Sequence, residues 1–176
     1  YVSLRNRSLS DAKILDYGCG YGRMTWMMYY YTDPASIWSV DPWDFAVDLC
    51  RESGMLGNLA QSDYLPTSLP APERGIDVMF AFSVFTHTSR SATDAALSAM
   101  RKHIADDGLL AITIRSPEYW SADPQYAADA ARLEKQHAKE GFAFVPHQRY
   151  TVEGEATYGD TSMTLEFLTA NYPDWK

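Results

Sequence analysis

The sequence has little cysteine, no long apolar run and no excess of basic residues. Its two cysteines, Cys19 and Cys50, form neither a disulfide framework nor a metal-binding spacing, so we expect reduced thiols in a cytoplasmic protein. No apolar run reaches the roughly 18 residues that a membrane-spanning helix needs. The formal net charge of −8 disfavours nucleic acid as the main partner, because binding a phosphate backbone requires a basic surface.

The chain is long enough for one globular domain. Its 176 residues are 46% hydrophobic and 22% charged, which is typical of a globular protein. Short apolar segments alternate with segments of helical spacing, a pattern that predicts a doubly wound, mainly parallel α/β sheet with helices on both faces. The expected strands are 14–16, 37–40, 57–61, 76–82 and 108–114, and the expected helices are 24–32, 44–53, 91–105, 121–139 and 164–171. We expect the methionines and tyrosines of the first helix to pack in the core.

A glycine-rich stretch, residues 12–23, reads AKILDYGCGYGR. Apolar strand residues end there at Asp16, and Gly18, Gly20 and Gly22 follow at every second position. Glycine permits positive φ and a close approach of the backbone to a ligand. The next helix points its first N–H groups toward the same place. The stretch therefore predicts a strand–loop–helix that binds a small molecule, although a tight turn that binds nothing is the alternative.

The acid in front of the glycines distinguishes two ligand classes. A dinucleotide fingerprint reads G-x-G-x-x-G, whereas this loop reads D-x-G-x-G-x-G. A carboxylate disfavours a pyrophosphate and favours a ligand with an amino group. The pattern resembles the first motif of class I S-adenosylmethionine (SAM)-dependent methyltransferases, in which the loop lies under the methionine part of the cofactor and the acid anchors that part. The resemblance implies cofactor contacts by Asp16, Tyr17, Gly18, Cys19, Gly20 and Arg23.

Asp41 follows the second expected strand, within the sequence VDPW. A carboxylate at this point can accept hydrogen bonds from both hydroxyls of a ribose, in SAM enzymes and NAD enzymes alike. Capping the next helix, ahead of Pro42, is the alternative role. Trp43 is expected either to lie against the adenine or to pack in the core.

The ends of the third and fourth expected strands supply further cofactor residues. The resemblance implies that Asp63, in QSDY, accepts a hydrogen bond from the adenine amino group, with Ser62 and Tyr64 close by. A polar turn is the alternative interpretation of this segment. Phe82 and Ser83 leave the fourth strand, and we expect them beneath the methyl-bearing sulfonium.

His87 is the candidate catalytic base. It lies in AFSVFTHTS, which resembles the segment after the fourth strand in many small-molecule methyltransferases. The ordinary pKa of histidine, about 6.5, suits general-base work near neutral pH. A base is needed only where the acceptor is a hydroxyl or a protonated amine. The alternative role is structural, with the imidazole bonded to the glycine loop or a neighbouring carbonyl.

The acceptor is expected to bind among residues after the fifth strand. Arg115 would bind an acidic acceptor or form a salt bridge with a neighbouring acid. The other candidates for the acceptor pocket are Glu118, Tyr119, Trp120, His147, Arg149, Tyr158 and Asp160.

We predict a single methyltransferase domain over residues 1–176, with a core at 12–115 and a lid and substrate region at 116–176. Segments 142–145 and 155–158 are expected to pair as a hairpin lid. The two further edge strands of the resembled fold are not evident after Trp175, and the chain begins without methionine or a signal segment. We therefore expect a piece of a longer protein that has lost these strands, the alternative being that the two lid segments replace them.

The predicted function is methyl transfer from SAM to a small-molecule acceptor, with S-adenosylhomocysteine as the product. Methylation at oxygen or nitrogen stays open, as does the oligomeric state, and no metal is expected. The alternatives are an NAD(P)-linked oxidoreductase, which shares Asp41 but lacks the glycine spacing, and a non-catalytic SAM-binding module.

Overall fold

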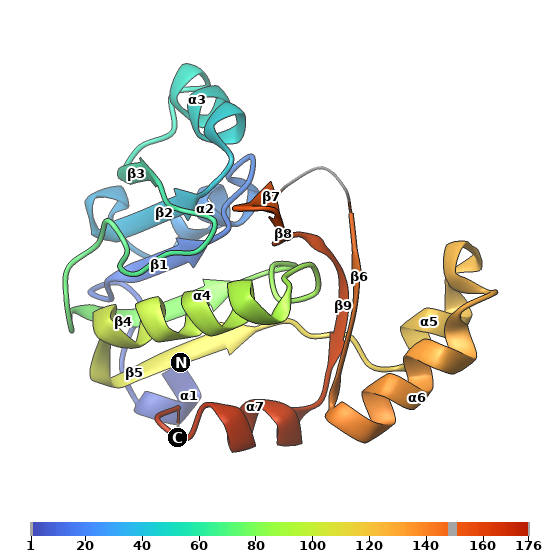
Figure 1. The fold of residues 1–176 in the computed structure, drawn as a ribbon. Coiled ribbons are helices and arrows are strands. Elements are labelled where there is room, and N and C mark those ends of the chain that lie inside the picture. The colour runs from blue at the N-terminus through green and yellow to red at the C-terminus, as the bar shows by residue number, and fades with distance from the viewer. Residues whose placement is uncertain (1, 148–150, 176) are drawn as a thin grey trace.

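The computed structural model describes residues 2–147 and 151–175. Its centre is a five-stranded sheet in the order β3–β2–β1–β4–β5, with every neighbouring pair parallel (Figure 1). The strands are β1 (Ile14–Tyr17), β2 (Ile37–Asp41), β3 (Asn58–Gln61), β4 (Ile76–Ala81) and β5 (Ile104–Ile112). The strand order reverses between β1 and β4, which confirms the predicted doubly wound sheet.

Seven α-helices and two short 3₁₀ helices connect these strands within the described residues. They are α1 (Val2–Arg5), α2 (Arg23–Met28), η1 (Pro34–Ser36), α3 (Asp44–Glu52), α4 (Arg90–His103), α5 (Glu118–Ala122), η2 (Pro124–Tyr126), α6 (Ala130–Glu140) and α7 (Leu165–Asn171). The longest, α4, begins after Ser89, whose side chain accepts a hydrogen bond from the Ala92 N–H. Figure 1 shows α4 lying along one face of the sheet.

Alternate residues of the central strands face opposite sides of the sheet. Leu15 and Met79 pack with Leu97 of α4 in the main core cluster. Ile14 and Val78 belong to a separate cluster on the other side, against which Met28 and other residues pack. Both faces of the central strands are therefore buried, which explains why β1 and β4 read as nearly continuous apolar runs.

The segment after the glycine loop differs from the prediction. Helix α2 ends at Met28, and Asp33 caps η1 instead of closing a longer helix. The side chains of Met27, Tyr30 and Tyr31 are more than half exposed, so the expected core role for these residues was wrong. A six-residue helix presents one short face to the sheet, and the chain leaves the core before the tyrosines.

The C-terminal region forms two small antiparallel pairs. Strand β6 (Phe142–Pro146) pairs with β9 (Gly159–Met163), and β7 (Thr151–Val152) pairs with β8 (Glu155–Ala156). The predicted pairing of 142–145 with 155–158 was therefore wrong. Gly154, at φ +84°, lies in the turn that joins β7 to β8, and the fully buried residues of β9 are left to pair with β6.

The β6–β9 pair is separate from the five-stranded sheet in the part of the chain that the structure describes. It packs instead on a second core formed with α5, η2 and α6, which contains Trp120, Tyr126, Leu133 and Ala143. The indole N–H of Trp120 donates to the hydroxyl of Ser162 on β9 at 2.7 Å. The expected loss of two edge strands stays a prediction.

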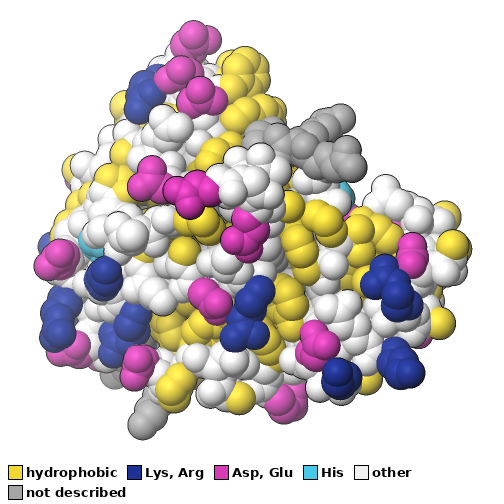
Figure 2. Space-filling view, in the orientation of Figure 1, with side chains coloured by type: hydrophobic (Ala, Val, Ile, Leu, Met, Phe, Trp, Pro, Cys, Tyr) yellow, Lys and Arg dark blue, Asp and Glu magenta, His cyan; other side chains and the backbone are white. Residues whose placement is uncertain are grey.

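The surface and helix lengths add two findings. On the face in Figure 2, Lys and Arg side chains are interspersed with Asp and Glu and do not gather into one basic patch. No helix in the described ranges has the length and apolarity required to span a membrane.

Candidate functional site

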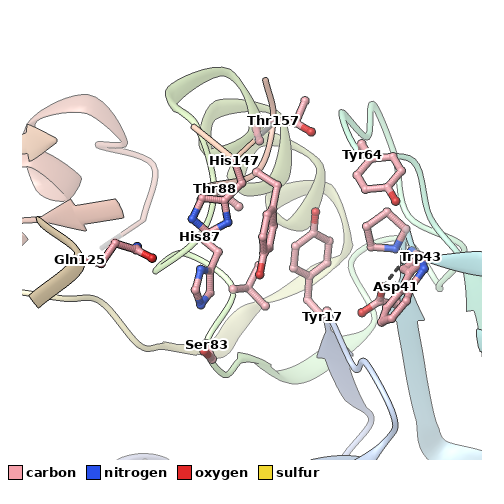
Figure 3. Close-up of a pocket in the computed structure, with 15 residues that line it drawn as sticks. Tyr17, Asp41, Trp43, Tyr64, Ser83, His87, Thr88, Gln125, His147 and Thr157 are labelled. Atoms are coloured by element: carbon pink, nitrogen blue, oxygen red, sulfur yellow. Dashed lines mark hydrogen bonds between the residues drawn. The ribbon is translucent and has the colours of Figure 1, made fainter. Parts of the chain in front are cut away.

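A cavity of about 820 Å³ lies at the carboxyl ends of the central strands, where the strand order reverses. This volume falls within the range of small-molecule sites, roughly 300–1,000 Å³. Figure 3 shows Tyr17, Asp41, Trp43 and Tyr64 on one side, and His87, Thr88 and His147 on the other. The cavity is lined by Tyr17, Gly18, Asp41, Pro42, Trp43, Tyr64, Ser83, Val84, His87, Thr88, Ala92, Gln125, His147, Thr157 and Tyr158.

The glycine loop is held tightly between β1 and α2. Gly18 lies at φ +72°, and a Cβ added there would be 2.4 Å from Cγ2 of Val84. The N–H groups of Gly18 and Cys19 both donate to the carbonyl of Val40, at 2.8 and 3.1 Å. The backbone therefore turns sharply away from β1 at a place where a side chain does not fit.

Asp41 joins the glycine loop to the start of the segment that leads into α3. One carboxylate oxygen accepts from the Gly20 N–H at 2.8 Å, and the other accepts from the Trp43 N–H at 2.9 Å. Burial raises the pKa of Asp41, and these two hydrogen bonds oppose that rise. Each oxygen retains another lone pair, so the carboxylate can cap the backbone and still accept from ligand hydroxyls.

Asp16 lies beneath the loop and does not line the cavity. Its Oδ2 accepts a hydrogen bond from the Thr25 hydroxyl at 2.7 Å, and that hydroxyl also contacts Ser39 Oγ at 2.8 Å. Burial, assisted by the charge of Asp41, raises the pKa of Asp16 to about 6. Two buried acids that repel each other favour a cation nearby, because its charge would stabilise both ionised forms.

Aromatic residues form the wall beside Asp41. Trp43 packs against Tyr21, with ring centroids 5.7 Å apart and planes at 62°, and lines the cavity instead of joining a core cluster. At the end of β3, the Ser62 hydroxyl is the buried side-chain polar atom that has no hydrogen-bond partner within residues 2–147 and 151–175. Glycine loop, carboxylate, aromatic wall and this unpaired hydroxyl fit a nucleoside that carries a positive charge.

His87 lies in the opposite wall, and both of its ring nitrogens have partners. Nδ1 is 2.8 Å from the carbonyl oxygen of Gly159, and Nε2 is 3.2 Å from Nη2 of Arg115. The ring stacks on Tyr158 with centroids 5.2 Å apart. Burial lowers the pKa of His87, and the nearby charge of Arg115 lowers it further. The imidazole thus makes the carbonyl bond that its structural interpretation predicts.

Arg115 and Asp160 form an ion pair behind this wall. Nη1 of Arg115 is 2.5 Å from Oδ1 of Asp160, and the guanidinium lies over the Tyr119 ring at 4.1 Å from its centroid. Asp160 also accepts a hydrogen bond from the hydroxyl of Tyr126. Neither charged side chain lines the cavity. The geometry therefore favours the salt-bridge alternative for Arg115 over binding of an acidic acceptor.

The structure brings about half of the sequence-predicted site residues together. Those that line the cavity are Tyr17, Gly18, Asp41, Pro42, Trp43, Tyr64, Ser83, His87, His147 and Tyr158. Those outside its lining are Asp16, Cys19, Gly20, Arg23, Ser62, Asp63, Phe82, Arg115, Glu118, Tyr119, Trp120 and Asp160. Asp63 and Phe82 are exposed, and Arg149 lies outside the described residues.

Five lining residues were not among the predicted site residues: Val84, Thr88, Ala92, Gln125 and Thr157. Val84 and Thr88 lie in the same segment as Ser83 and His87, so their place after β4 was a usable signal. Gln125 and Thr157 carry no local signal, because tertiary packing alone brings η2 and the end of β8 to the cavity.

Comparisons with known proteins agree with this geometry. A family model described as a methyltransferase domain matches residues 14–108. The solved structure of a DhpI–SAM–HEP complex superposes with a TM-score of 0.61 at 15% identity, over 98% of this chain and 72% of that chain. A search of curated protein sequences found no match.

Two further solved structures share the fold. A TehB-like SAM-dependent methyltransferase from Corynebacterium glutamicum has a TM-score of 0.53 at 16% identity, over 88% of this chain and 82% of that chain. CalS10, an amino pentose methyltransferase from Micromonospora echinaspora, has a TM-score of 0.52 at 21% identity, over 63% and 44%. Because the family match alone spans more than half of the sequence, the chain belongs to the class I SAM-dependent methyltransferases.

Proposed function

We propose that this methyltransferase acts on an uncharged small molecule that binds in the cavity beside the cofactor. The observation that carries the proposal is the division of the cavity lining into two halves. The cofactor half follows β1, β2 and β3 and consists of Tyr17, Gly18, Asp41, Pro42, Trp43 and Tyr64. The acceptor half follows β4 or comes from the C-terminal region and consists of Ser83, Val84, His87, Thr88, Ala92, Gln125, His147, Thr157 and Tyr158.

Each part of the cofactor half suits one part of the ligand. Asp41 accepts the ribose hydroxyls, and Trp43 and Tyr64 enclose the base. The glycine loop and the buried charge of Asp16 lie toward the cationic amino-acid end. When bound, SAM supplies an already activated methyl group, so the chain has only to align the acceptor and exclude water.

The acceptor half is polar but carries no fixed charge. Asp41, in the cofactor half, is the only Asp, Glu, Lys or Arg in the cavity lining of the described residues. Arg115 is neutralised by Asp160 behind the wall. An anionic acceptor would meet no cation there, and burying an unpaired charge is costly. Hydroxyl, amide and imidazole groups favour a neutral acceptor with hydrogen-bonding groups.

The cofactor assignment is tested by calorimetric titration of the chain with SAM, S-adenosylhomocysteine and NAD. We expect binding of both sulfur nucleotides and none of NAD. Asp41→Ala should weaken SAM binding about 100-fold, because it removes two charge-assisted hydrogen bonds to the ligand. Asp48→Ala is the matched control, since this exposed acid on α3 pairs only with Arg51 in the structure. Binding of NAD in place of SAM would support an oxidoreductase.

The acceptor assignment needs a second measurement. Transfer of a labelled methyl group should be detectable with neutral phenols, alcohols, sugars or amines and absent with matched carboxylates and phosphates. SAM binding without transfer to any compound of a broad panel would favour a non-catalytic SAM-binding module. Preferential methylation of anionic compounds would contradict the uncharged lining.

A further inference from the structure

Two histidines face the acceptor half, and their hydrogen bonds differ. The Gly159 carbonyl can only accept, so Nδ1 of His87 carries the proton of the neutral ring. Its Nε2 lone pair then accepts from Arg115, which always carries protons. His87 has no lone pair left for a substrate proton.

His147 has the opposite arrangement. Its Nε2 is 3.0 Å from Oδ2 of Asp160, and a carboxylate accepts, so the proton lies on Nε2 and the lone pair on Nδ1. Within the described residues, Nδ1 has no hydrogen-bond partner. The side chain lines the cavity and is 36% exposed.

The backbone and a neighbouring ring fix this imidazole. The His147 N–H donates to the Tyr158 carbonyl at 2.9 Å, and the Tyr158 ring packs edge-on at 5.5 Å between centroids. Figure 3 shows His147 beside His87 on the side of the cavity that faces Asp41. The ring is thus held at the wall of the acceptor half.

Asp160 is suited to stabilise a protonated His147. It is 4% exposed and accepts hydrogen bonds from Tyr126 and Arg115 as well as His147. Burial raises the pKa of Asp160, but the bonds from Tyr126 and Arg115 outweigh that effect and hold the pKa below its ordinary value. An ionised carboxylate that orients an imidazole and stabilises its cation is the arrangement that general-base catalysis requires.

We infer that His147 is the general base for an acceptor hydroxyl, and that Asp160 is its positioning residue. The inference rests on the proposed function and makes the reaction an O-methylation. The acceptor O–H proton moves to Nδ1 of His147. The methyl carbon forms its bond to that oxygen, and the electron pair of the broken carbon–sulfur bond stays on sulfur. The proton then leaves from the exposed part of the imidazole to water.

The charged and titratable groups around His147 come from four parts of the fold. Asp160 lies on β9, Tyr126 on η2, His87 in the segment after β4, and Arg115 after β5, with Tyr158 beside the ring. Only Asp160 contacts the ring of His147 as an anion. Protonation of His147 therefore creates a pair of opposite charges, whereas protonation of His87 would place a second cation against Arg115.

The first test needs no acceptor. Long-range proton–nitrogen NMR of the chain with S-adenosylhomocysteine bound reports which nitrogen of each imidazole is protonated. We expect the Nε2–H form for His147 and the Nδ1–H form for His87. An Nδ1–H form for His147 would overturn the inference while leaving the proposed function intact. Failure of the wild-type chain to bind SAM or S-adenosylhomocysteine would instead overturn the proposed function.

The second test uses phenol, catechol and glucose as hydroxyl probes and aniline as an amine probe. His147→Gln keeps a donor to Asp160, so we expect unchanged SAM affinity and about a 100-fold loss of kcat with a hydroxyl probe. The loss of rate toward acidic pH should disappear in this variant and persist in His87→Gln. Added imidazole should restore transfer in His147→Gly, and Asp160→Glu should retain more rate than Asp160→Asn. Methylation of aniline alone, or a wild-type pH profile in His147→Gln, would overturn the inference.

Discussion

The cofactor half and the acceptor half of the cavity are built in different ways. The cofactor half follows three parallel strands of one sheet, and backbone hydrogen bonds from Gly18, Cys19 and Gly20 hold it in place. The acceptor half joins segments from residue 83 to residue 158, and hydrogen bonds to the buried carboxylate of Asp160 hold three of those segments together. One half is set by local backbone geometry, and the other by tertiary contacts.

The two halves also differ in how their buried acids are satisfied. Asp16 is ionised at neutral pH at the expense of folding, because burial raises its pKa to about 6. Asp160 is ionised with the help of folding, because hydrogen-bond donors outweigh its burial. The cofactor half therefore keeps uncompensated negative charge for a cationic ligand, whereas the acceptor half is electrically neutral.

The largest expected effect is on the glycine loop. Gly18→Ala should lower the free energy of unfolding by about 3 to 4 kcal/mol, since a positive φ and a collision with Val84 act together. Gly20→Ala is the matched control. Gly20 has φ +51° and no atom within 4 Å of an added Cβ, so we expect a loss of only about 1 kcal/mol. Urea unfolding of both variants measures the difference.

A double variant separates the two causes. Val84→Ala should recover part of the stability lost in Gly18→Ala, because it removes the methyl group that lies 2.4 Å from the added Cβ. Equal losses for Gly18→Ala and Gly20→Ala would show that close packing against Val84 does not shape the cofactor half.

The next effect has the opposite sign. Asp16→Asn should raise the free energy of unfolding of the ligand-free chain by about 2 kcal/mol at pH 7, because one pH unit of pKa shift is worth about 1.4 kcal/mol. The folded-state pKa of about 6 exceeds the ordinary value of 3.8, so the folded state binds more protons than the unfolded state between these values. This contribution to stability is therefore lost as pH rises through about 6.

Urea unfolding as a function of pH tests this sign. The advantage of Asp16→Asn should be greatest at neutral pH and vanish below the ordinary pKa of aspartate. Wild-type affinity for SAM should fall as pH decreases through about 6, and the variant should bind SAM more weakly without that pH dependence. A variant less stable than wild type at pH 7 would mean that the buried charge does not oppose folding.

A smaller effect is expected in the acceptor half. Tyr126→Phe removes one hydrogen bond to Asp160 and should lower the free energy of unfolding by about 1.5 kcal/mol. Tyr119→Phe, which loses a 3.2 Å bond to the partly exposed Asp123, should lose about 0.5 kcal/mol. Calorimetry should show unchanged SAM affinity in both variants, and a large loss of affinity in Tyr126→Phe would show that the halves are energetically coupled.

The same division explains what could be predicted from the sequence. The strand–glycine–helix stretch, Asp41 and the parallel sheet follow from patterns within about a dozen residues, and the structure shows each of them. The pairing of β6 with β9 was missed because segments 155–158 and 159–163 have similar strand propensity, and burial decides between them. The Asp160 contacts join five distant segments, which no local pattern encodes.

The smallest expected effect tests whether the two halves can be changed separately. The backbone N–H of Gln125 donates to the Asp123 side chain at 3.0 Å and helps to hold η2, while the Gln125 side chain is exposed at the rim of the acceptor half. Gln125→Ala therefore leaves that capping bond in place and removes one neutral hydrogen-bonding group, worth about 0.5–1.5 kcal/mol. We expect the KM of a hydroxyl acceptor to rise about threefold, with the Kd of SAM unchanged, in paired kinetic and calorimetric measurements. A change in the Kd of SAM with no change in acceptor KM would place the cofactor against η2 and reverse the assignment of the two halves.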